Sequence, residues 1–307
     1  MIPLLFYSGA VIICSGLFYG YYCLWLRNNR FHHWNRYYLL AAVLGSLFIP
    51  LLNIPVMPGP AAADTAILQY TARLSVVKAH WLAPVTISAQ KGLDFTAIVS
   101  ILYLLVLILL LGRLFTGYAR MLRLIRKSET KLTGSHYKLI ATEDERGPYS
   151  FFNFIFWNGF IPVDSPAGQQ MLQHELLHIR EKHSVDKMLM EIIASVCWIN
   201  PFFYLIKKEL ELVHEFSADE KAASLDDETH AYAELLLMKT LGTRQHAFPA
   251  SLTNNFFHPP IKRRLQMLIR KNNGRLSWLK KAGILPVALC TFIFFGCQNN
   301  TKEVMAK

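Results

Sequence analysis

Long apolar runs alternate with polar segments along the chain, and these runs are its strongest pattern. Three runs near the N-terminus, residues 2–26, 37–57 and 94–118, are long enough for an α-helix to cross a hydrocarbon core, which takes roughly 20 residues. A fourth run, residues 283–297, is shorter but apolar throughout. We therefore expect a multi-pass α-helical membrane protein. The first run should be a retained anchor, because no basic segment precedes it and no small-residue cleavage pattern follows it.

A more polar segment lies between the third and fourth runs, and it predicts strands followed by helices. The stretches "HYKLIAT" (136–142) and "FFNFIFW" (151–157) have the β-branched and aromatic content of strands, with the turn-like "EDERGP" between them. The longer stretch "PYSFFNFIFW" is either an edge strand that pairs with an extended peptide or a core strand of a small sheet. The expected organisation is a three-span membrane region (1–118), an inserted α+β domain of mainly helical content (119–275), and a last span with a short external tail (276–307).

The helices of the polar segment have recognisable starts. Ser165 can cap a helix whose first residue is Pro166, and this helix should run to about Lys182. Asn200 and Pro201 repeat that pattern at the start of a later helix. The last helix, "PIKRRLQMLIRK", is amphipathic, and its basic face is expected beside the fourth span. Further helices are expected over about 186–198 and 228–241.

Composition and charge agree with a membrane protein. Of the 307 residues 53% are hydrophobic, above the usual share of roughly 45–50%. The formal charge of +11 reflects basic segments that flank the apolar runs, "RNNRFHHWNR" and "RMLRLIRK". By the positive-inside rule, the N-terminus is external and the polar domain is cytoplasmic. The charge is thus a topology signal, direct nucleic-acid binding is not expected, and His32 and His33 should lie at the membrane interface.

The stretch "QHELLH" carries the strongest chemical signal of the polar domain. On an α-helix, residues i and i+4 share a face, so His174 and His178 can present two imidazoles to one ion. Glu175 sits one position round the helix, near the ion but displaced from it. Two histidines that bind Zn²⁺ and a carboxylate that takes a proton from the attacking water form the H-E-x-x-H arrangement of zinc peptidases. The five cysteines include no CxxC pair, so a thiolate zinc site is not implied.

A catalytic zinc usually has three protein ligands, so a third must come from elsewhere in the chain. The stretch "HEFSAD" offers Glu215 as that ligand. One helical turn later, Asp219 can accept a hydrogen bond from a ligating imidazole. Glu211, a turn before Glu215, is a competing ligand, although the pairing with Asp219 favours Glu215.

Other polar side chains near the motif are expected to be structural. His183 should be a solvated helix end, and His214 should point about 100° away from Glu215 around its helix. Asp186 is expected to cap the helix that follows, although it could instead orient His178.

The apolar run 188–206 is long enough to suggest another membrane crossing. Glu191 and the Asn-Pro break favour buried helices instead. A crossing there would also leave His174 and Glu215 on opposite sides of the membrane.

With these pieces in place, the sequence resembles the BlaR/MecR-type membrane zinc peptidases, gluzincins that act as β-lactam sensors and antirepressors. The resemblance rests on "HELLH", "NPF", "HEFSAD" and "PIKRRLQML" in this order, and the last two look like versions from Bacteroidetes-type bacteria. It implies a zinc endopeptidase domain on the cytoplasmic side of the bacterial inner membrane, with His174, His178 and Glu215 as ligands and Glu175 as general base. The best-known members carry an external penicillin-binding domain after the last span, which this sequence lacks, so β-lactam sensing does not follow from the resemblance.

The sequence thus predicts a membrane-embedded zinc endopeptidase that acts as a regulatory sensor or antirepressor and cleaves itself or a cytosolic repressor. One alternative is a quality-control protease of the prenyl-peptidase or heat-shock type, which shares H-E-x-x-H and a later E-x-x-x-D. The "NPF" and "PIKRRLQML" segments favour the first interpretation. Another is a non-catalytic signal transducer with a structural zinc. Glu175 argues against it, because a closed structural site needs no base. The last run also resembles a lipoprotein signal ending at Cys297, although its internal position favours a membrane span.

Overall fold

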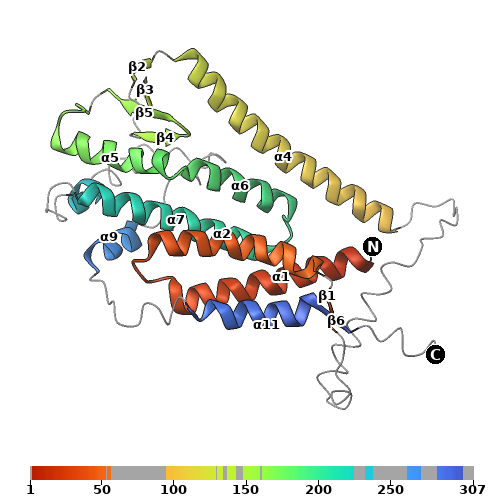
Figure 1. The fold of residues 1–307 in the computed structure, drawn as a ribbon. Coiled ribbons are helices and arrows are strands. Elements are labelled where there is room, and N and C mark those ends of the chain that lie inside the picture. Colours follow the sequence, from red (N-terminus) through yellow and green to blue (C-terminus); the bar gives the residue numbers. More distant parts are fainter. Residues whose placement is uncertain are drawn as a thin grey trace, which may run out of the picture.

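The computed structural model is mostly helical, with a small sheet at one side (Figure 1). Helices suit this sequence because its apolar runs are long and uninterrupted, whereas strand-like content is confined to short stretches. The structure describes residues 2–52, 54–56, 95–128, 130–133, 137–142, 148–159, 161–224, 232–237, 261–270 and 282–299. The segment 58–93, between the second and third apolar runs, lies outside these residues.

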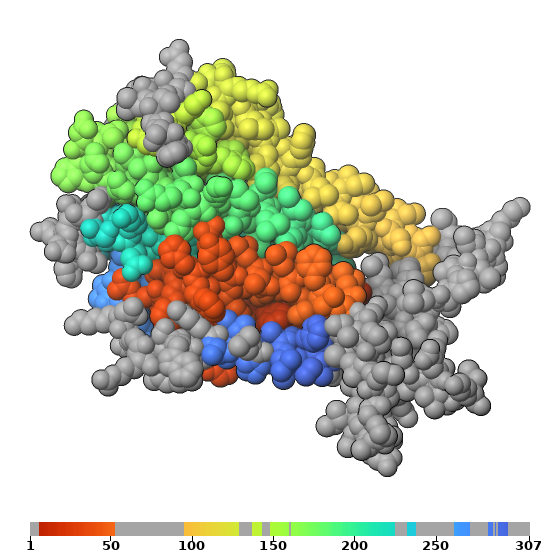
Figure 2. All heavy atoms as spheres, in the orientation of Figure 1, coloured from red at the N-terminus to blue at the C-terminus, as the bar shows by residue number. Residues whose placement is uncertain are grey.

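The first two apolar runs form a helical hairpin that packs against the last run. Its helices, α1 and α2, contact each other, and α1 also contacts α11. Figure 2 shows this hairpin, in red and orange, lying directly against α11 in blue. Two short strands, β1 and β6, pair in parallel at the end of this group. The elements are α1 (Ile2–Tyr21) with a π-helical turn (Tyr22–Leu26), α2 (His32–Phe48) with a 3-10 turn (Ile49–Leu51), β1 (Ile54–Val56), α11 (Ile284–Gly296) and β6 (Cys297–Asn299).

The third apolar run belongs to one long helix, α4 (Phe95–Lys127), at the edge of the molecule (Figure 1). None of its residues is buried, and Tyr103 and Tyr118 make its aromatic contacts, with Trp198 and Phe151. Its 33 residues give a length of about 50 Å. The helix is therefore longer than a hydrocarbon core, and it continues without a break through the basic segment "RMLRLIRK".

Two helical segments of the described chain are long and apolar enough to cross a membrane, Phe6–Leu26 and Phe95–Lys127. The helices of the second and fourth runs are shorter, with 17 residues in α2 and 13 in α11. The second run is shortened because α2 ends at Phe48, just before Pro50, which favours a helix end. The helices of the first and third predicted spans are thus long and apolar enough to cross a membrane. The four-span layout remains a prediction.

The apolar run 188–206 forms the tip of a helical hairpin. The two helices are α6 (His183–Val196) and α7 (Pro201–Ala223), and they pack against each other. As predicted, Asn200 caps α7, because its side chain accepts a hydrogen bond from the N–H of Phe202 at 3.0 Å. The Asn200 amide also donates to Ser15 of α1 at 2.9 Å, so the tip lies beside the first apolar helix. Because the chain turns back at this tip, the run does not separate His174 from Glu215.

The largest hydrophobic core of the described chain joins this hairpin to the N-terminal helices. Its buried side chains come from α1, the turn after it, α2, α6 and α7. The helices of the polar domain are therefore packed directly on the apolar N-terminal helices. The core residues are Val11, Cys14, Phe18, Tyr21, Tyr22, Leu26, Tyr38, Leu39, Ala42, Val43, Met190, Ile193, Phe203, Ile206, Leu210 and Val213.

The small sheet packs on α5 (Pro166–Arg180), at the other side of the polar domain. Its strand order is β2-β3-β5-β4, with β3 and β5 parallel and the other pairs antiparallel. The stretch "PYSFFNFIFW" is a tight hairpin rather than one strand, and Phe152 takes a left-handed conformation (φ 48°) in its turn. Both sequence interpretations therefore hold in part, because β4 is the edge strand and β5 lies inside the sheet. The strands are β2 (Thr130–Thr133), β3 (Lys138–Thr142), β4 (Tyr149–Phe151) and β5 (Phe154–Asn158).

The start of α5 confirms the predicted cap. The N–H of Gly168 donates to the hydroxyl of Ser165 at 3.0 Å, and Pro166 is the first helical residue. Gly168 is required here, because a Cβ atom at this position would lie 2.1 Å from the carbonyl oxygen of Pro162. The helix ends at Arg180, two residues after His178 of the metal-ligand motif.

Candidate metal centre

Two packed helices bring His174, His178 and Glu215 together. The histidines lie one turn apart on α5, and Glu215 faces them from α7. The Nε2 atoms of the two imidazoles are 3.3 Å apart. One Glu215 oxygen lies 3.4 Å from Nε2 of His174, and the other lies 3.5 Å from Nε2 of His178. Across the described residues, these side chains form the single group of three or more potential ligands whose donor atoms lie within 4.8 Å of one another.

The distances suit a four-coordinate metal ion. With metal–ligand bonds of about 2.0–2.1 Å, neighbouring donors of a tetrahedral zinc site lie about 3.3 Å apart. Two imidazoles and one carboxylate are also a donor set of catalytic zinc sites, in which a fourth position stays open. The residues therefore fit a divalent metal ion that takes nitrogen and oxygen ligands.

The other ring nitrogen of His174 faces a buried carboxylate and a phenol. Its Nδ1 lies 3.0 Å from the Tyr232 hydroxyl and 3.3 Å from a carboxylate oxygen of Asp219. The Tyr232 hydroxyl in turn donates to Asp219 at 2.8 Å. Such contacts select the tautomer of a ligating histidine and hold its ring in place. Sequence reasoning singled out Asp219 but missed Tyr232, because no motif connects a tyrosine at that distance along the chain to the site.

Arg264 of α9 (Ile261–Ile269) sets a positive charge behind these carboxylates. Its guanidinium donates to Asp219 at 2.7 and 2.5 Å and lies 3.1 Å from an oxygen of Glu215. Its neighbour Arg263 forms two hydrogen bonds to Glu209 of α7, at 2.9 and 3.0 Å. The prediction that the basic face of this helix lies beside the fourth span is therefore wrong. The buried carboxylates of α7 require paired charges, and α9 supplies them.

Burial and these charges set the protonation of the site. Burial lowers the pKa of His174, but hydrogen bonds with Asp219 and Glu215 outweigh it and raise that pKa to about 9. Burial dominates at His178 and holds its pKa well below the ordinary 6.5. Burial would raise the pKa of the Glu215 and Asp219 carboxyls, but the Arg264 charge holds both below their ordinary values. Both carboxylates are therefore ionised at neutral pH, as a cation site requires.

A comparison with known protein families matches residues 165–268 to the family described as BlaR1 peptidase M56. The matched segment spans α5, α6, α7 and most of α9, so it contains the whole His-His-Glu group. This part of the chain is a BlaR1-type peptidase domain. The match confirms the resemblance that "HELLH", "NPF" and "HEFSAD" indicated. No curated protein shows significant similarity to the chain.

Within the BlaR1-type domain, the prediction that His183 is a solvated helix end is wrong. Its side chain is 1% exposed, and its Nδ1 lies 2.7 Å from Nδ1 of His178. The cause is a left-handed residue, Lys182 (φ 57°), at the joint between α5 and α6. This turn directs the first residue of α6 back towards the metal-ligand helix. Such a turn is rare for a lysine, and the sequence contains no glycine or asparagine at 182 that would have signalled it.

Asp186 and His214 form a second buried pair of the domain. Asp186 does not cap α6, because the helix begins three residues earlier, at His183. Its carboxylate instead lies 3.0 Å from Nε2 of His214 and 2.6 Å from Nε of Arg36 in α2. His214 points away from the metal-ligand group, as its position next to Glu215 on the helix predicted, and its ring stacks on His183 with centroids 3.9 Å apart.

The other glutamates near the site of the BlaR1-type domain differ in position. Glu175 follows His174 on α5 and is 5% exposed, so the motif glutamate is buried within the domain. Of the two glutamates considered as third ligand, the structure brings Glu215 to the histidines. Glu211 lies outside the His-His-Glu group, and burial raises the pKa of its carboxyl.

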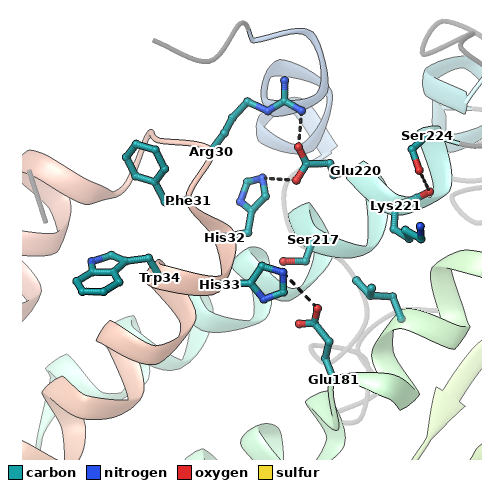
Figure 3. A pocket seen from close by; sticks show the side chains of 11 residues that line it. Arg30, Phe31, His32, His33, Trp34, Glu181, Ser217, Glu220, Lys221 and Ser224 are labelled. Atoms are coloured by element: carbon teal, nitrogen blue, oxygen red, sulfur yellow. Dashed lines mark hydrogen bonds and ion pairs between the residues drawn. The ribbon is translucent and has the colours of Figure 1, made fainter. Parts of the chain in front are cut away.

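The loop between α1 and α2 meets the BlaR1-type domain at an open pocket of about 380 Å³ (Figure 3). His32 is buried there, with its ring against Phe216 and its Nε2 3.7 Å from Glu220. The prediction of a membrane-interface position is therefore wrong for His32, because α7 covers it. His33 is exposed and lies 3.5 Å from Glu181 at the end of α5. The basic loop is thus a contact surface for the peptidase domain.

Proposed function

We propose that the protein is a membrane-bound zinc endopeptidase that acts as a regulatory sensor or antirepressor. The observation that carries the proposal is the His-His-Glu group, whose facing donor atoms lie 3.3–3.5 Å apart on two helices of a BlaR1-type peptidase domain. This spacing suits a catalytic zinc ion with an open fourth position. The buried Glu175 beside His174 is the feature that separates a hydrolytic site from a structural one.

His174, His178 and Glu215 would hold the ion, which supplies a Lewis acid and makes water a nucleophile near neutral pH. Glu175 would accept a proton from the attacking water and pass it to the amine that leaves when the peptide bond breaks. Asp219 and Tyr232 would hold the His174 ring in the tautomer that leaves Nε2 free for the metal.

The membrane placement that we propose has the basic ends of the apolar helices on the cytoplasmic side and the N-terminus outside. Two candidate spans, the contact of α11 with α1, and the basic segments at 27–36 and 120–127 support it. The α6–α7 hairpin would then enter the membrane beside α1 and return. Its exposed apolar side chains near the tip agree with lipid contact: Ile192, Val196, Ile199, Tyr204 and Leu205.

A protein is the proposed substrate, either this chain itself or a cytosolic repressor. The edge strand β4 supports a peptide substrate, because only β5 pairs with it in the described sheet and its other edge can accept an extended backbone. The sheet lies on α5, the helix that carries both histidines. A peptide added to this edge would therefore bind next to the helix of the metal-ligand motif.

The test compares Glu175→Gln with the wild type in native membranes. The variant should keep stoichiometric zinc and lose proteolysis, because the ligands remain and only the base is changed. Glu234→Gln, the same chemical change at an exposed position, is the matched control and should cleave normally. Cleavage by Glu175→Gln at the wild-type rate would refute the mechanism. Signalling that survives in Glu175→Gln but fails in His174→Ala would instead favour a non-catalytic transducer.

A further inference from the structure

A continuous chain of polar contacts runs from the metal-ligand helix to the N-terminal hairpin. His178 meets His183 through their Nδ1 atoms at 2.7 Å. Nε2 of His183 lies 3.1 Å from Oε2 of Glu181. That same oxygen is 3.1 Å from Nη1 of Arg36, which belongs to α2. The contacts are nearly all buried, with side-chain exposures of 9% for Arg36 and 13% for Glu181.

The donors and acceptors along this chain are mutually consistent if His178 binds a metal through Nε2. Its Nδ1 must then carry the proton, so it donates to the unprotonated Nδ1 of His183. His183 consequently carries its own proton on Nε2, which faces the Glu181 carboxylate. Glu181 accepts from His183 and from Arg36.

Arg36 fixes the α2 end of this series of polar contacts through several hydrogen bonds. Beyond its bond to the Glu181 carboxylate, its Nη2 donates to the Glu181 backbone carbonyl at 2.5 Å. Its Nε donates to Asp186 at 2.6 Å, and Asp186 holds His214, which stacks on His183. One guanidinium from α2 thus binds Glu181 in the turn between α5 and α6 and Asp186 in the first turn of α6.

We propose that Arg36 and His183 are positioning residues for the metal site: Arg36 holds the α5–α6 turn, and the turn presents His183 to orient the His178 imidazole. The N-terminal hairpin thereby becomes a structural part of the metal centre, although it supplies no ligand. Because coupling between two sites is reciprocal, a displacement of α2 changes metal affinity, and metal binding holds α2 in place. The inference rests on the proposed metal site.

The test measures zinc affinity of the full-length chain in detergent or nanodiscs, by competition with a chromophoric chelator. His183→Phe keeps the ring and its stacking on His214 but removes both nitrogens, and it should weaken zinc binding by about 10- to 100-fold. His183→Asn carries an amide oxygen near the position of Nδ1 and should recover most of the loss. Arg36→Met should weaken binding by about tenfold, and Arg36→Lys should do so less.

Arg30→Met is the matched control for Arg36. Arg30 lies in the loop just before α2 and also pairs with the peptidase domain, through Glu220 (Figure 3) and the carbonyl of Arg270. It takes no part in the contacts that connect Arg36 to His178. The Arg30→Met variant loses the same positive charge as Arg36→Met and should bind zinc like the wild type. If Arg36→Met does not fold, Glu181→Gln replaces it and should weaken binding in the same direction.

The outcomes separate this inference from the proposed function. Folded His183→Phe and Arg36→Met variants with wild-type zinc affinity would overturn the positioning roles while leaving the metal site intact. An equal loss in Arg30→Met would also overturn them, since it would point to a general effect of charge. A wild-type chain that binds no divalent metal would overturn the proposed function itself.

Discussion

The guanidinium of Arg264 forms a bidentate ion pair with the carboxylate of Asp219, with Nε 2.7 Å from Oδ2 and Nη2 2.5 Å from Oδ1. The pair connects α9 to α7 behind the metal-ligand group, and Asp219 also faces His174. Asp219 and Glu215, two of the negative charges in the candidate site, thus share one arginine from a separate helix as a counterion. The stability of the site in the absence of metal should depend on this arginine.

Arg264→Gln should therefore destabilise the chain by about 3–5 kcal/mol when zinc is removed with a chelator, because two buried carboxylates lose their counterion. Added zinc should reduce the difference from the wild type, since the ion supplies a positive charge beside Glu215. Denaturant or thermal unfolding in detergent, with and without zinc, measures both effects. Arg120→Gln on the exposed face of α4 should change stability by less than about 0.5 kcal/mol. An equal deficit with and without zinc would contradict the electrostatic explanation.

Tyr232→Phe should weaken zinc binding by about tenfold while the fold is kept. The substitution removes the hydroxyl that lies between His174 and Asp219, so the imidazole loses one of the two contacts at Nδ1. Zinc titration against a chelator of known affinity measures the change. Tyr204→Phe is a suitable control, because its hydroxyl bonds only a backbone carbonyl, that of Ala194, away from the site. Wild-type affinity in Tyr232→Phe would remove this tyrosine from the metal centre.

The Asp186 carboxylate should make stability depend on pH in the acid range. Burial would raise its pKa, but hydrogen bonds from His214 and Arg36 hold it below the ordinary 3.8. Because the folded pKa is the lower one, ionised Asp186 stabilises the fold above pH 3.8, and this contribution is lost as the pH falls through the folded pKa. Asp186→Asn should thus be less stable than the wild type at pH 7. Unfolding curves from pH 7 to 3 should show the gap closing below about pH 4, whereas a constant gap would argue against the linkage.

Asn200→Ala should detach the tip of the α6–α7 hairpin from α1. Asn200 caps α7 through the N–H of Phe202 and donates a buried hydrogen bond to Ser15. Loss of both should cost about 2 kcal/mol or more, whereas Ser15→Ala should cost about 1 kcal/mol. A double-mutant cycle isolates the contact between the helices. Additive effects would show that the two side chains are not coupled.

Local features of the fold could be predicted because they depend on neighbouring residues. Ser165 and Asn200, each followed by proline, marked the starts of α5 and α7, since capping satisfies backbone groups within the first turn. The facing of His174 and His178 follows from the helical repeat alone. Glu215 was a harder inference, because its approach to the histidines requires two helices to pack. The need of a catalytic metal site for a third protein ligand is what points to it.

Long-range contacts could not be predicted in the same way. The basic residues of 27–36 and 260–271 looked like membrane-interface charges, yet Arg36, Arg263 and Arg264 bind buried carboxylates of the peptidase domain. His183 looked like a solvated helix end, and a left-handed lysine turns it inward. Charge and hydropathy describe what a side chain prefers, whereas its partner depends on which helices pack together.

The sequence by itself determined the helix that presents two imidazoles and a carboxylate, and the apolar segments, because each depends on residues a few positions apart. The order of its motifs also indicated the resemblance of residues 165–268 to the BlaR1 peptidases. Only the tertiary structure decided that the N-terminal hairpin packs on the peptidase domain and reaches the metal-ligand helix through Arg36. That contact joins residues far apart in the sequence, because Arg36 lies 145 positions from Glu181 and 150 positions from Asp186. It exists because burying the apolar faces of α1, α2, α6 and α7 in one core brings their charged ends together, where each charge needs a partner.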